Sequence, residues 1–230
     1  MAFDEALVPR ALFGGAIALA LPARFQDVSD FRPVPDNQEV FADASTDQSV
    51  IVEVLERHAS LPDASAARFF FLDLAEEGSP LEPPAALEPG PNDAAVAASA
   101  DAGPTWRLEE ARLADARAVC PLLRLPAAAG APPPPSPPLG LAAGELLASK
   151  GRQDASKANV VRLFLAVVRL EAYASELLVT MNAPTFINPA SAAAKDTEGA
   201  GNRPEAQAAG ALFTKILATL DVKDYGLFGV

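Results

Sequence analysis

Carboxylates are concentrated in one short part of the sequence, and they are the first candidates for chemistry. Residues 27–56 hold eight acids and one base, Arg32, so this stretch has a net charge of minus 7 within a chain of minus 12. The acids are Asp27, Asp30, Asp36, Glu39, Asp43, Asp47, Glu53 and Glu56. Such groups can bind a hard cation or a basic partner, whereas nucleic acid and anionic membranes are repelled on average. A solvated face without a partner is the simpler interpretation of any charge run.

Other residue types give little support to an enzyme. The acidic stretch lacks the D-x-[DN]-x-[DN]-G spacing of a calcium loop, and the chain has no phosphate-binding glycine motif. His58 is the only histidine, and packing or solvent exposure explains it without a general base. Cys120 is the only cysteine, lies in an apolar stretch, and fits a small buried hydrophobe. We therefore predict a protein without covalent chemistry, cofactor or metal site.

The end of the acidic stretch has the periodicity of a helix beginning after Thr46. Apolar residues recur there at spacings of one, three and four, namely Val50, Ile51, Val54 and Leu55. The β-branched run VIVEV makes a strand the rival interpretation, but the following LERHA favours a helix. On that helix, Glu53 and Glu56 would share one exposed face.

The remaining patterned blocks predict a sheet with helices on its faces. Short or continuous apolar runs predict strands at 16–21, 67–74, 160–170 and 176–182, the first following a turn at Gly14 and Gly15. Steps of three and four among apolar residues predict a helix over 203–220, with Pro204 in its first turn. Strand blocks adjacent in the sequence favour antiparallel pairing.

Length and composition favour one domain over residues 1–230. Stretches rich in Ala, Pro and small polar residues predict flexible insertions at 76–104, 126–143 and 188–202. Residues 11–22 resemble the apolar core of a secretory signal, but Asp4 and Glu5 precede them, which favours a buried strand. No run reaches the roughly 18 to 20 apolar residues of a membrane helix.

Several motifs together resemble one protein family. The block RPVPDNQEVF followed by TDQSVIVEVLE closely resembles the Ran guanine-nucleotide release factor family, the MOG proteins of nuclear transport. The segments LFGGA, ARFFFLDL, SKGRQDASKAN, LLVTMNAP and ATLDVKDYGLFG resemble, in order, the family's opening turn, central strand, hairpin turn, late strand and C-terminal segment. The Ala- and Pro-rich insertions depart from that pattern.

The resemblance implies an α/β/α sandwich around a central antiparallel sheet, similar to the PsbP fold. It also implies a monomer in nucleus and cytoplasm that binds the small GTPase Ran through a basic surface of Ran and promotes release of its nucleotide. The positions implied for Ran binding are Asp27, Glu39, Asp47, Glu53 and Glu56, with Asp30 and Asp36 as secondary candidates. Phe31 and Phe41 are available for apolar contact, but core positions are favoured for both.

Two other classes stay open at the level of sequence. An adaptor could use the same acidic face to hold another basic protein without affecting nucleotide. A PsbP-like organellar subunit would share the fold and would need a cleaved targeting segment.

Overall fold

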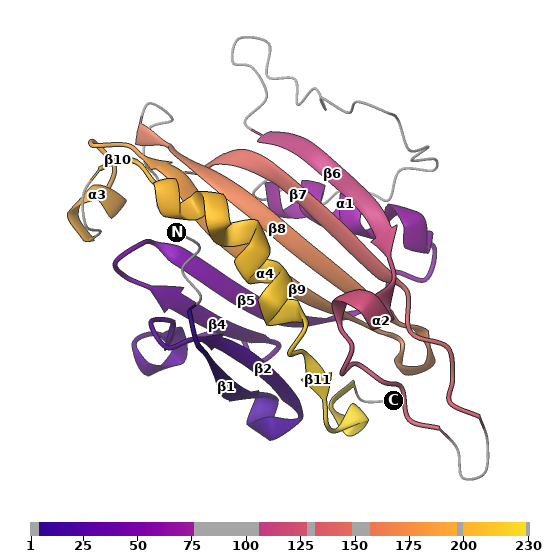
Figure 1. The fold of residues 1–230 in the computed structure, drawn as a ribbon. Coiled ribbons are helices and arrows are strands. Elements are labelled where there is room, and N and C mark those ends of the chain that lie inside the picture. Colours follow the sequence, from indigo (N-terminus) through magenta and orange to yellow (C-terminus); the bar gives the residue numbers. More distant parts are fainter. Residues whose placement is uncertain (1–4, 76–105, 128–131, 149–156, 197–199, 229–230) are drawn as a thin grey trace.

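A computed structural model describes residues 5–75, 106–127, 132–148, 157–196 and 200–228. Within these ranges the chain forms two antiparallel sheets and few helices (Figure 1). The larger, eight-stranded sheet has the order β3-β4-β5-β9-β8-β7-β6, with β10 paired to β9, and the smaller one the order β1-β2-β11. The strands are β1 (Leu7–Leu12), β2 (Ile17–Pro22), β3 (Gln26–Asp27), β4 (Gln38–Asp43), β5 (Gln48–Glu56), β6 (Trp106–Ala114), β7 (Leu139–Ala148), β8 (Asn159–Leu170), β9 (Ser175–Ile187), β10 (Gly201–Asn202) and β11 (Asp221–Val222).

The helical elements are short and lie between or beside these strands. The α-helices are α1 (Asp63–Ala75), α2 (Ala116–Val119), α3 (Ala193–Asp196) and α4 (Ala209–Leu217). Single 3-10 turns include η1 (Phe13–Gly15), η2 (Val28–Asp30), η4 (Glu171–Tyr173), η5 (Pro204–Ala208) and η6 (Tyr225–Phe228). The predicted C-terminal helix is therefore present, but its first turn, which contains Pro204, is a 3-10 turn.

The large sheet has apolar cover on both faces. On one face α1 packs against β6, β7 and β8, with Phe69, Phe70 and Phe71 in the second of two hydrophobic clusters. On the other face α4 and the small sheet close the first cluster, and Figure 1 shows α4 running diagonally across β8 and β9 with α1 behind the sheet. The prediction of an antiparallel sheet is confirmed. Helices were expected to cover it, but one face of the large sheet is covered by the small sheet as well as by α4.

Two predicted elements have the opposite secondary structure. Residues 48–56, expected to be helical, form strand β5 between β4 and β9. Val50 and Val52 enter the first cluster while Leu55 packs against the second. Both faces of the strand thus carry apolar residues, so the alternation of apolar and polar residues by which a strand is recognised is incomplete. The β-branched side chains of VIVEV fit a strand better than a helix.

The aromatic run 67–74, expected to be a strand, lies in helix α1. A short apolar run cannot by itself distinguish a buried strand from a buried helix. Close approach to β7 is possible because two of its residues lack a side chain. A Cβ atom at Gly140 would lie 2.9 Å from the Ala67 Cβ, and one at Gly144 would lie 2.5 Å from the Phe71 Cζ. The two glycines therefore allow α1 to pack closely on β7.

The remaining strand predictions agree with the structure. The turn at Gly14 and Gly15 has φ values of 66° and 96° and leads into β2, as expected. Residues 160–170 and 176–182 lie in β8 and β9, which extend slightly further.

Two of the three predicted flexible insertions contain regular secondary structure. Strand β7 begins at Leu139, inside the range 126–143, and the backbone N–H of Arg169 donates to the Pro138 carbonyl at 2.9 Å. The range 188–202 contains α3 and β10, with Ser191 and Ala193 buried. Small residues can therefore be buried in compact connections that composition alone assigns to linkers. Residues 76–104 and the hairpin turn at 149–156 lie outside the described residues.

Candidate partner-binding site

The predicted acidic residues lie on β3, η2, β4 and β5 and in the loops on either side of β4, at one end of the large sheet. The register pairs Asp27 with Phe41, Gln38 with Glu53 and Asp43 with Gln48. These pairings place the acidic residues along the β4–β5 hairpin and its neighbouring edge strand. They also determine which carboxylates can meet one partner surface.

Glu53 and Glu56 do not share a helix face. In a strand, residues three apart point to opposite faces of the sheet. Glu53 is cross-strand to Gln38, and its carboxylate accepts a hydrogen bond of 2.7 Å from the Gln38 Nε2. Glu56 is exposed at the end of β5. The predicted pairing of these two carboxylates on one surface is therefore wrong.

Residues 28–37, which we call the η2 loop, carry Asp30 and Asp36 and are anchored beside Asp27 and Glu53. At its start, Asp27 Oδ1 accepts hydrogen bonds from the Ser29 N–H at 2.8 Å and the Ser29 hydroxyl at 2.6 Å. At its end, Asn37 Nδ2 donates to Glu53 Oε1 at 3.2 Å, and the Val54 N–H donates to the Asn37 carbonyl at 2.9 Å. The loop is thus fixed at both ends.

We call Asp27, Asp30, Asp36 and Glu53 the acidic edge. Asp30 and Asp36 are exposed within the η2 loop, and Asp27 and Glu53 lie at its two anchor points, half-buried. In the described part of the chain, Arg32 is the only base within the loop. A fixed loop holds carboxylates in a defined arrangement, which favours selective binding of a basic surface over general attraction.

Glu39 has a structural contact of its own. Its Oε1 accepts a hydrogen bond of 2.6 Å from the backbone N–H of Phe13, in the turn between β1 and β2. Phe13 has a φ of 50°, which is rare for a residue other than glycine. Glu39 therefore links β4 to the strained turn, and its carboxylate is directed at the small sheet.

Asp47 lies at the far end of the β4–β5 hairpin from Glu53. The two are separated by about 20 Å of strand, at about 3.3 Å per residue. Asp47 has a φ of 57°, and its N–H donates to the Asp43 carbonyl at 2.9 Å, which closes the turn. Asp is one of the residues that tolerate this left-handed conformation.

Asp43, beside that turn, is buried and is not available to a partner. Its Oδ2 accepts hydrogen bonds of 2.6 Å from both Arg24 Nη1 and the Thr46 hydroxyl, and Ser45 donates to its Oδ1. Burial alone would raise the pKa of Asp43, but the hydrogen bonds from Thr46, Arg24 and Ser45 outweigh it and lower the pKa below its ordinary value. One of the eight acids therefore serves the fold.

Sequence reasoning missed a buried ion cluster where β8 turns into β9. Arg169 and Glu176 are 1% and 0% exposed, and Arg169 Nη2 lies 3.1 Å from Glu176 Oε1. The two residues are cross-strand neighbours in the hairpin register. Arg169 also donates to the carbonyls of Leu61 at 2.7 Å and His58 at 2.8 Å. The signal in the sequence was an arginine and a glutamate beside long apolar runs, at the end of β8 and the start of β9.

This cluster fixes the connection between β5 and α1. The His58 N–H donates to Glu176 Oε1 at 3.2 Å, so both polar backbone groups of His58 are held by the β8–β9 hairpin. The His58 ring lies 5.1 Å from the Phe69 ring and 5.9 Å from the Phe70 ring, which supports the packing role expected for it. Burial raises the pKa of Glu176, and the nearby Arg169 charge opposes this shift without cancelling it.

Other candidate chemistry finds little support. Cys120 is buried, so the prediction of a small buried side chain is confirmed, and burial raises the pKa of its thiol to about 12. Over the described ranges, no group of three or more His, Cys, Asp or Glu residues is arranged to hold a metal ion. In those same ranges no helix has the length and apolar character needed to cross a membrane.

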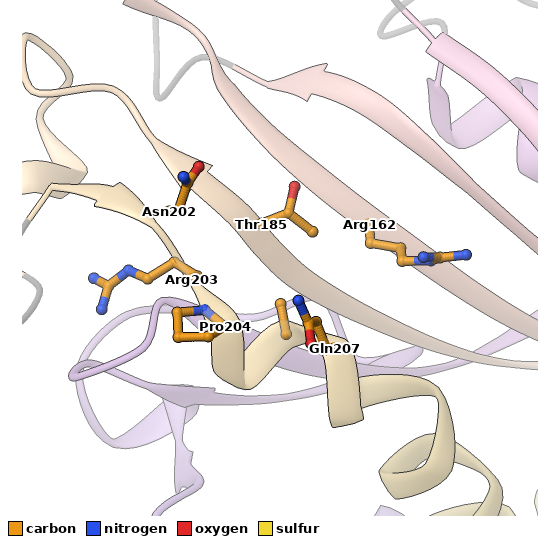
Figure 2. Close-up of a pocket in the computed structure, with 7 residues that line it drawn as sticks. Arg162, Thr185, Asn202, Arg203, Pro204 and Gln207 are labelled. Carbon is orange, nitrogen blue, oxygen red and sulfur yellow. The ribbon is translucent and has the colours of Figure 1, made fainter.

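An open pocket of about 430 Å³ lies between β8, β9 and η5. Its lining consists of Arg162, Thr185, Asn202, Arg203, Pro204, Ala206 and Gln207. Figure 2 shows the side chains of Arg162 and Arg203 extending away from each other. Arg162 also pairs with the carboxylate of Glu109. The two guanidinium groups do not converge, so this pocket lacks the geometry of an anion-binding site.

Comparison with known proteins gives a consistent result. The family model described as "Ran-interacting Mog1 protein" matches residues 10–184. A Ran guanine nucleotide release factor of Danio rerio is 33% identical over 220 residues, which cover 96% of this chain and 99% of the relative. The nuclear import protein mog1 of Schizosaccharomyces pombe is 43% identical over 65 residues, which cover 28% of this chain and 34% of the relative.

A solved structure has the same fold. The crystal structure of the Saccharomyces cerevisiae Ran-binding protein Mog1p superposes with a TM-score of 0.59 at 18% sequence identity, covering 98% of this chain and all of the other. This likeness supports the mixed α/β architecture with antiparallel sheets and few helices. Because the family model spans most of the sequence, the match does not rest on one motif. The chain belongs to the Ran-interacting Mog1 protein family.

Proposed function

We propose that this protein binds a Ran-type small GTPase through a basic surface of that GTPase and promotes release of its guanine nucleotide. The single observation that carries the proposal is the acidic edge, where the anchored η2 loop gathers Asp27, Asp30 and Asp36 beside Glu53. The names of the full-length relatives support a Ran-related role.

Nucleotide release needs no covalent step. If the protein binds the nucleotide-free GTPase more tightly than the loaded form, linkage requires it to weaken nucleotide binding by the same factor. Exposed carboxylates accelerate encounter with a basic surface and orient the complex. Release then follows from the difference between the two affinities.

The proposed contact residues fall into two groups. The acidic edge forms the primary contact, because Asp30 and Asp36 are exposed in one anchored loop, with Asp27 at its start and Glu53 bonded to Asn37 at its end. Glu39, Asp47 and Glu56 remain proposed Ran-binding residues at its margin. Glu39 is occupied by the Phe13 N–H, Asp47 lies at the far end of the hairpin, and Glu56 lies at the end of β5, beyond the residues that anchor the η2 loop. We expect these three to contribute less.

The finer features of the resemblance form part of the same proposal. We infer a monomer that acts as a single domain in nucleus and cytoplasm, supports nucleocytoplasmic protein transport, and has a PsbP-like α/β/α sandwich. Light scattering on the purified protein tests the monomer. A fluorescently tagged protein tests the location, since confinement to an organelle would contradict it.

The decisive test is release of labelled GDP and labelled GTP from purified Ran, with and without this protein. We expect release to accelerate as the protein concentration rises and to saturate. The control is Asp30→Lys combined with Asp36→Lys, two exposed residues of the η2 loop, which should retain the fold and lose most of the acceleration. Binding without any acceleration would identify an adaptor instead of a release factor.

A further inference from the structure

One aromatic side chain stands out on the surface of the η2 loop. Phe31 is 75% exposed, whereas the other exposed large apolar side chains of the described residues lie between 37% and 50%. The sequence favoured a core position for both Phe31 and Phe41. Phe41 is buried in the first cluster, but Phe31 is not, so the expectation is wrong for Phe31.

Exposure of a phenylalanine has a free-energy consequence. Burial of such a side chain stabilises a protein by about 1.5–3 kcal/mol, and the free protein lacks most of this stabilisation at Phe31. A single exposed apolar residue is common on protein surfaces and needs no explanation by itself. The position of Phe31 distinguishes it, because it lies within the loop that carries the acidic edge.

The backbone at Phe31 is held firmly. The Phe31 N–H donates to the Val28 carbonyl at 3.0 Å, and the Arg32 N–H donates to the same carbonyl at 3.1 Å. These bonds close the 3-10 turn η2, which Asp27 caps through the Ser29 N–H. The ring therefore projects from a fixed turn, so little backbone entropy would be lost when a partner covers it.

The surroundings of Phe31 indicate the chemistry of the partner. Asp30 precedes it, Asp27 caps its turn, and Asp36 lies further along the same loop. Arg32 follows Phe31 and is the one base of the loop. An exposed apolar side chain with charged residues in the same loop has the composition of an interface hot spot with a polar rim. The complementary surface is an apolar depression with lysine and arginine side chains around it. A second copy of this chain would instead bring two acidic edges together, which repulsion opposes.

We propose that Phe31 is the apolar anchor of the complex with the Ran-type GTPase, inserted into a depression within its basic surface. This inference rests on the proposed function. The carboxylates of the acidic edge determine the association rate, and the buried ring determines how long the complex lasts. Charge and apolar contact thus have separate kinetic effects.

The test compares Phe31→Ala with two controls in binding kinetics to immobilised nucleotide-free Ran. Leu113→Ala removes a side chain that is 49% exposed on β6, and Phe31→Leu keeps an apolar group at the site. We expect Phe31→Ala to raise the dissociation constant at least tenfold, mainly through faster dissociation, with the association rate changed less than about twofold. Leu113→Ala should resemble the wild type, and Phe31→Leu should lie in between.

The outcomes separate the two proposals. Wild-type binding with an unchanged Phe31→Ala dissociation rate overturns the anchor and leaves the proposed function standing. Absence of wild-type binding to Ran overturns both. Circular dichroism and the thermal midpoint of Phe31→Ala should match the wild type, because the ring is outside both hydrophobic clusters. Self-association of the wild type that Phe31→Ala abolishes would assign the ring to a second copy and overturn the inference.

Discussion

The acidic edge and the Arg169–Glu176 cluster both place charged residues on the large sheet, but they do so in opposite environments. At the acidic edge the carboxylates are exposed or half-buried. Their hydrogen bonds within the protein come from amide groups and from one hydroxyl. In the cluster both charges are buried and paired with each other. Exposed charges contribute little to stability, whereas a broken buried pair leaves an uncompensated charge in a dry site. The comparison therefore predicts binding effects at one region and folding effects at the other.

The largest expected effect is on stability, at the buried cluster. Arg169→Met should lower the free energy of unfolding by about 3–5 kcal/mol, because Glu176 then stays buried without its partner. The double variant Arg169→Met, Glu176→Leu should recover much of that loss. Urea denaturation followed by circular dichroism measures both variants. A single variant as stable as the wild type would show that the pair does not support the fold.

The next effect is on binding, at the acidic edge. Glu53→Lys should raise the dissociation constant for Ran about tenfold, roughly 1.4 kcal/mol, because it places a cation beside the basic surface and removes the hydrogen bonds from Asn37 and Gln38 that hold the η2 loop. The matched control is Glu56→Lys on the opposite side of the same strand, for which we expect a smaller change. Association rates at low and high salt measure the difference, since salt screens exposed charges. Equal losses for both variants would contradict a contact centred on the η2 loop.

A third prediction concerns pH and has opposite signs at two buried carboxyls. The pKa of Asp43 is lowered on folding, so its contribution to stability is present above the unfolded pKa and is lost as pH falls through the folded pKa. The pKa of Glu176 is raised on folding, so stability falls as pH rises from its unfolded pKa towards the folded one.

This prediction is tested by measuring the free energy of unfolding as a function of pH for Asp43→Asn and for Glu176→Gln, each compared with the wild type. The Asp43 variant should lose less stability on acidification than the wild type. The Glu176 variant should lose less than the wild type as pH rises through the window above the unfolded pKa. Curves parallel to the wild type would contradict the assigned shifts.

The smallest effect is expected at Asp47, far from the acidic edge along the hairpin. Asp47→Asn removes the charge while keeping a residue that tolerates positive φ, so stability should change by about 0.5 kcal/mol or less. Ran affinity should change less than with Glu53→Lys. The β-branched variant Asp47→Val should destabilise the fold, because that conformation is strained for it. Calorimetric unfolding and equilibrium binding measure the two quantities.

The sequence alone determined the family and several local features. Long apolar runs identified β8 and β9, paired glycines identified the β1–β2 turn, and steps of three and four identified the C-terminal helix. These elements were predictable because each has a local pattern that its own residues fix. The concentration of carboxylates in residues 27–56 was likewise visible without coordinates.

Tertiary structure decided the features that depend on neighbours. The segment VIVEVLE is a strand paired to β4 and β9, and ARFFFLDL is a helix packed on β7, where Gly140 and Gly144 leave room for it. Pairing across the β8–β9 hairpin joins Arg169 to Glu176, and the anchored η2 loop leaves Phe31 exposed. The spacing of apolar residues along the sequence cannot predict these features. A short apolar run looks the same whether it is buried as a strand or as a helix, and only the segments that pack against it decide between the two.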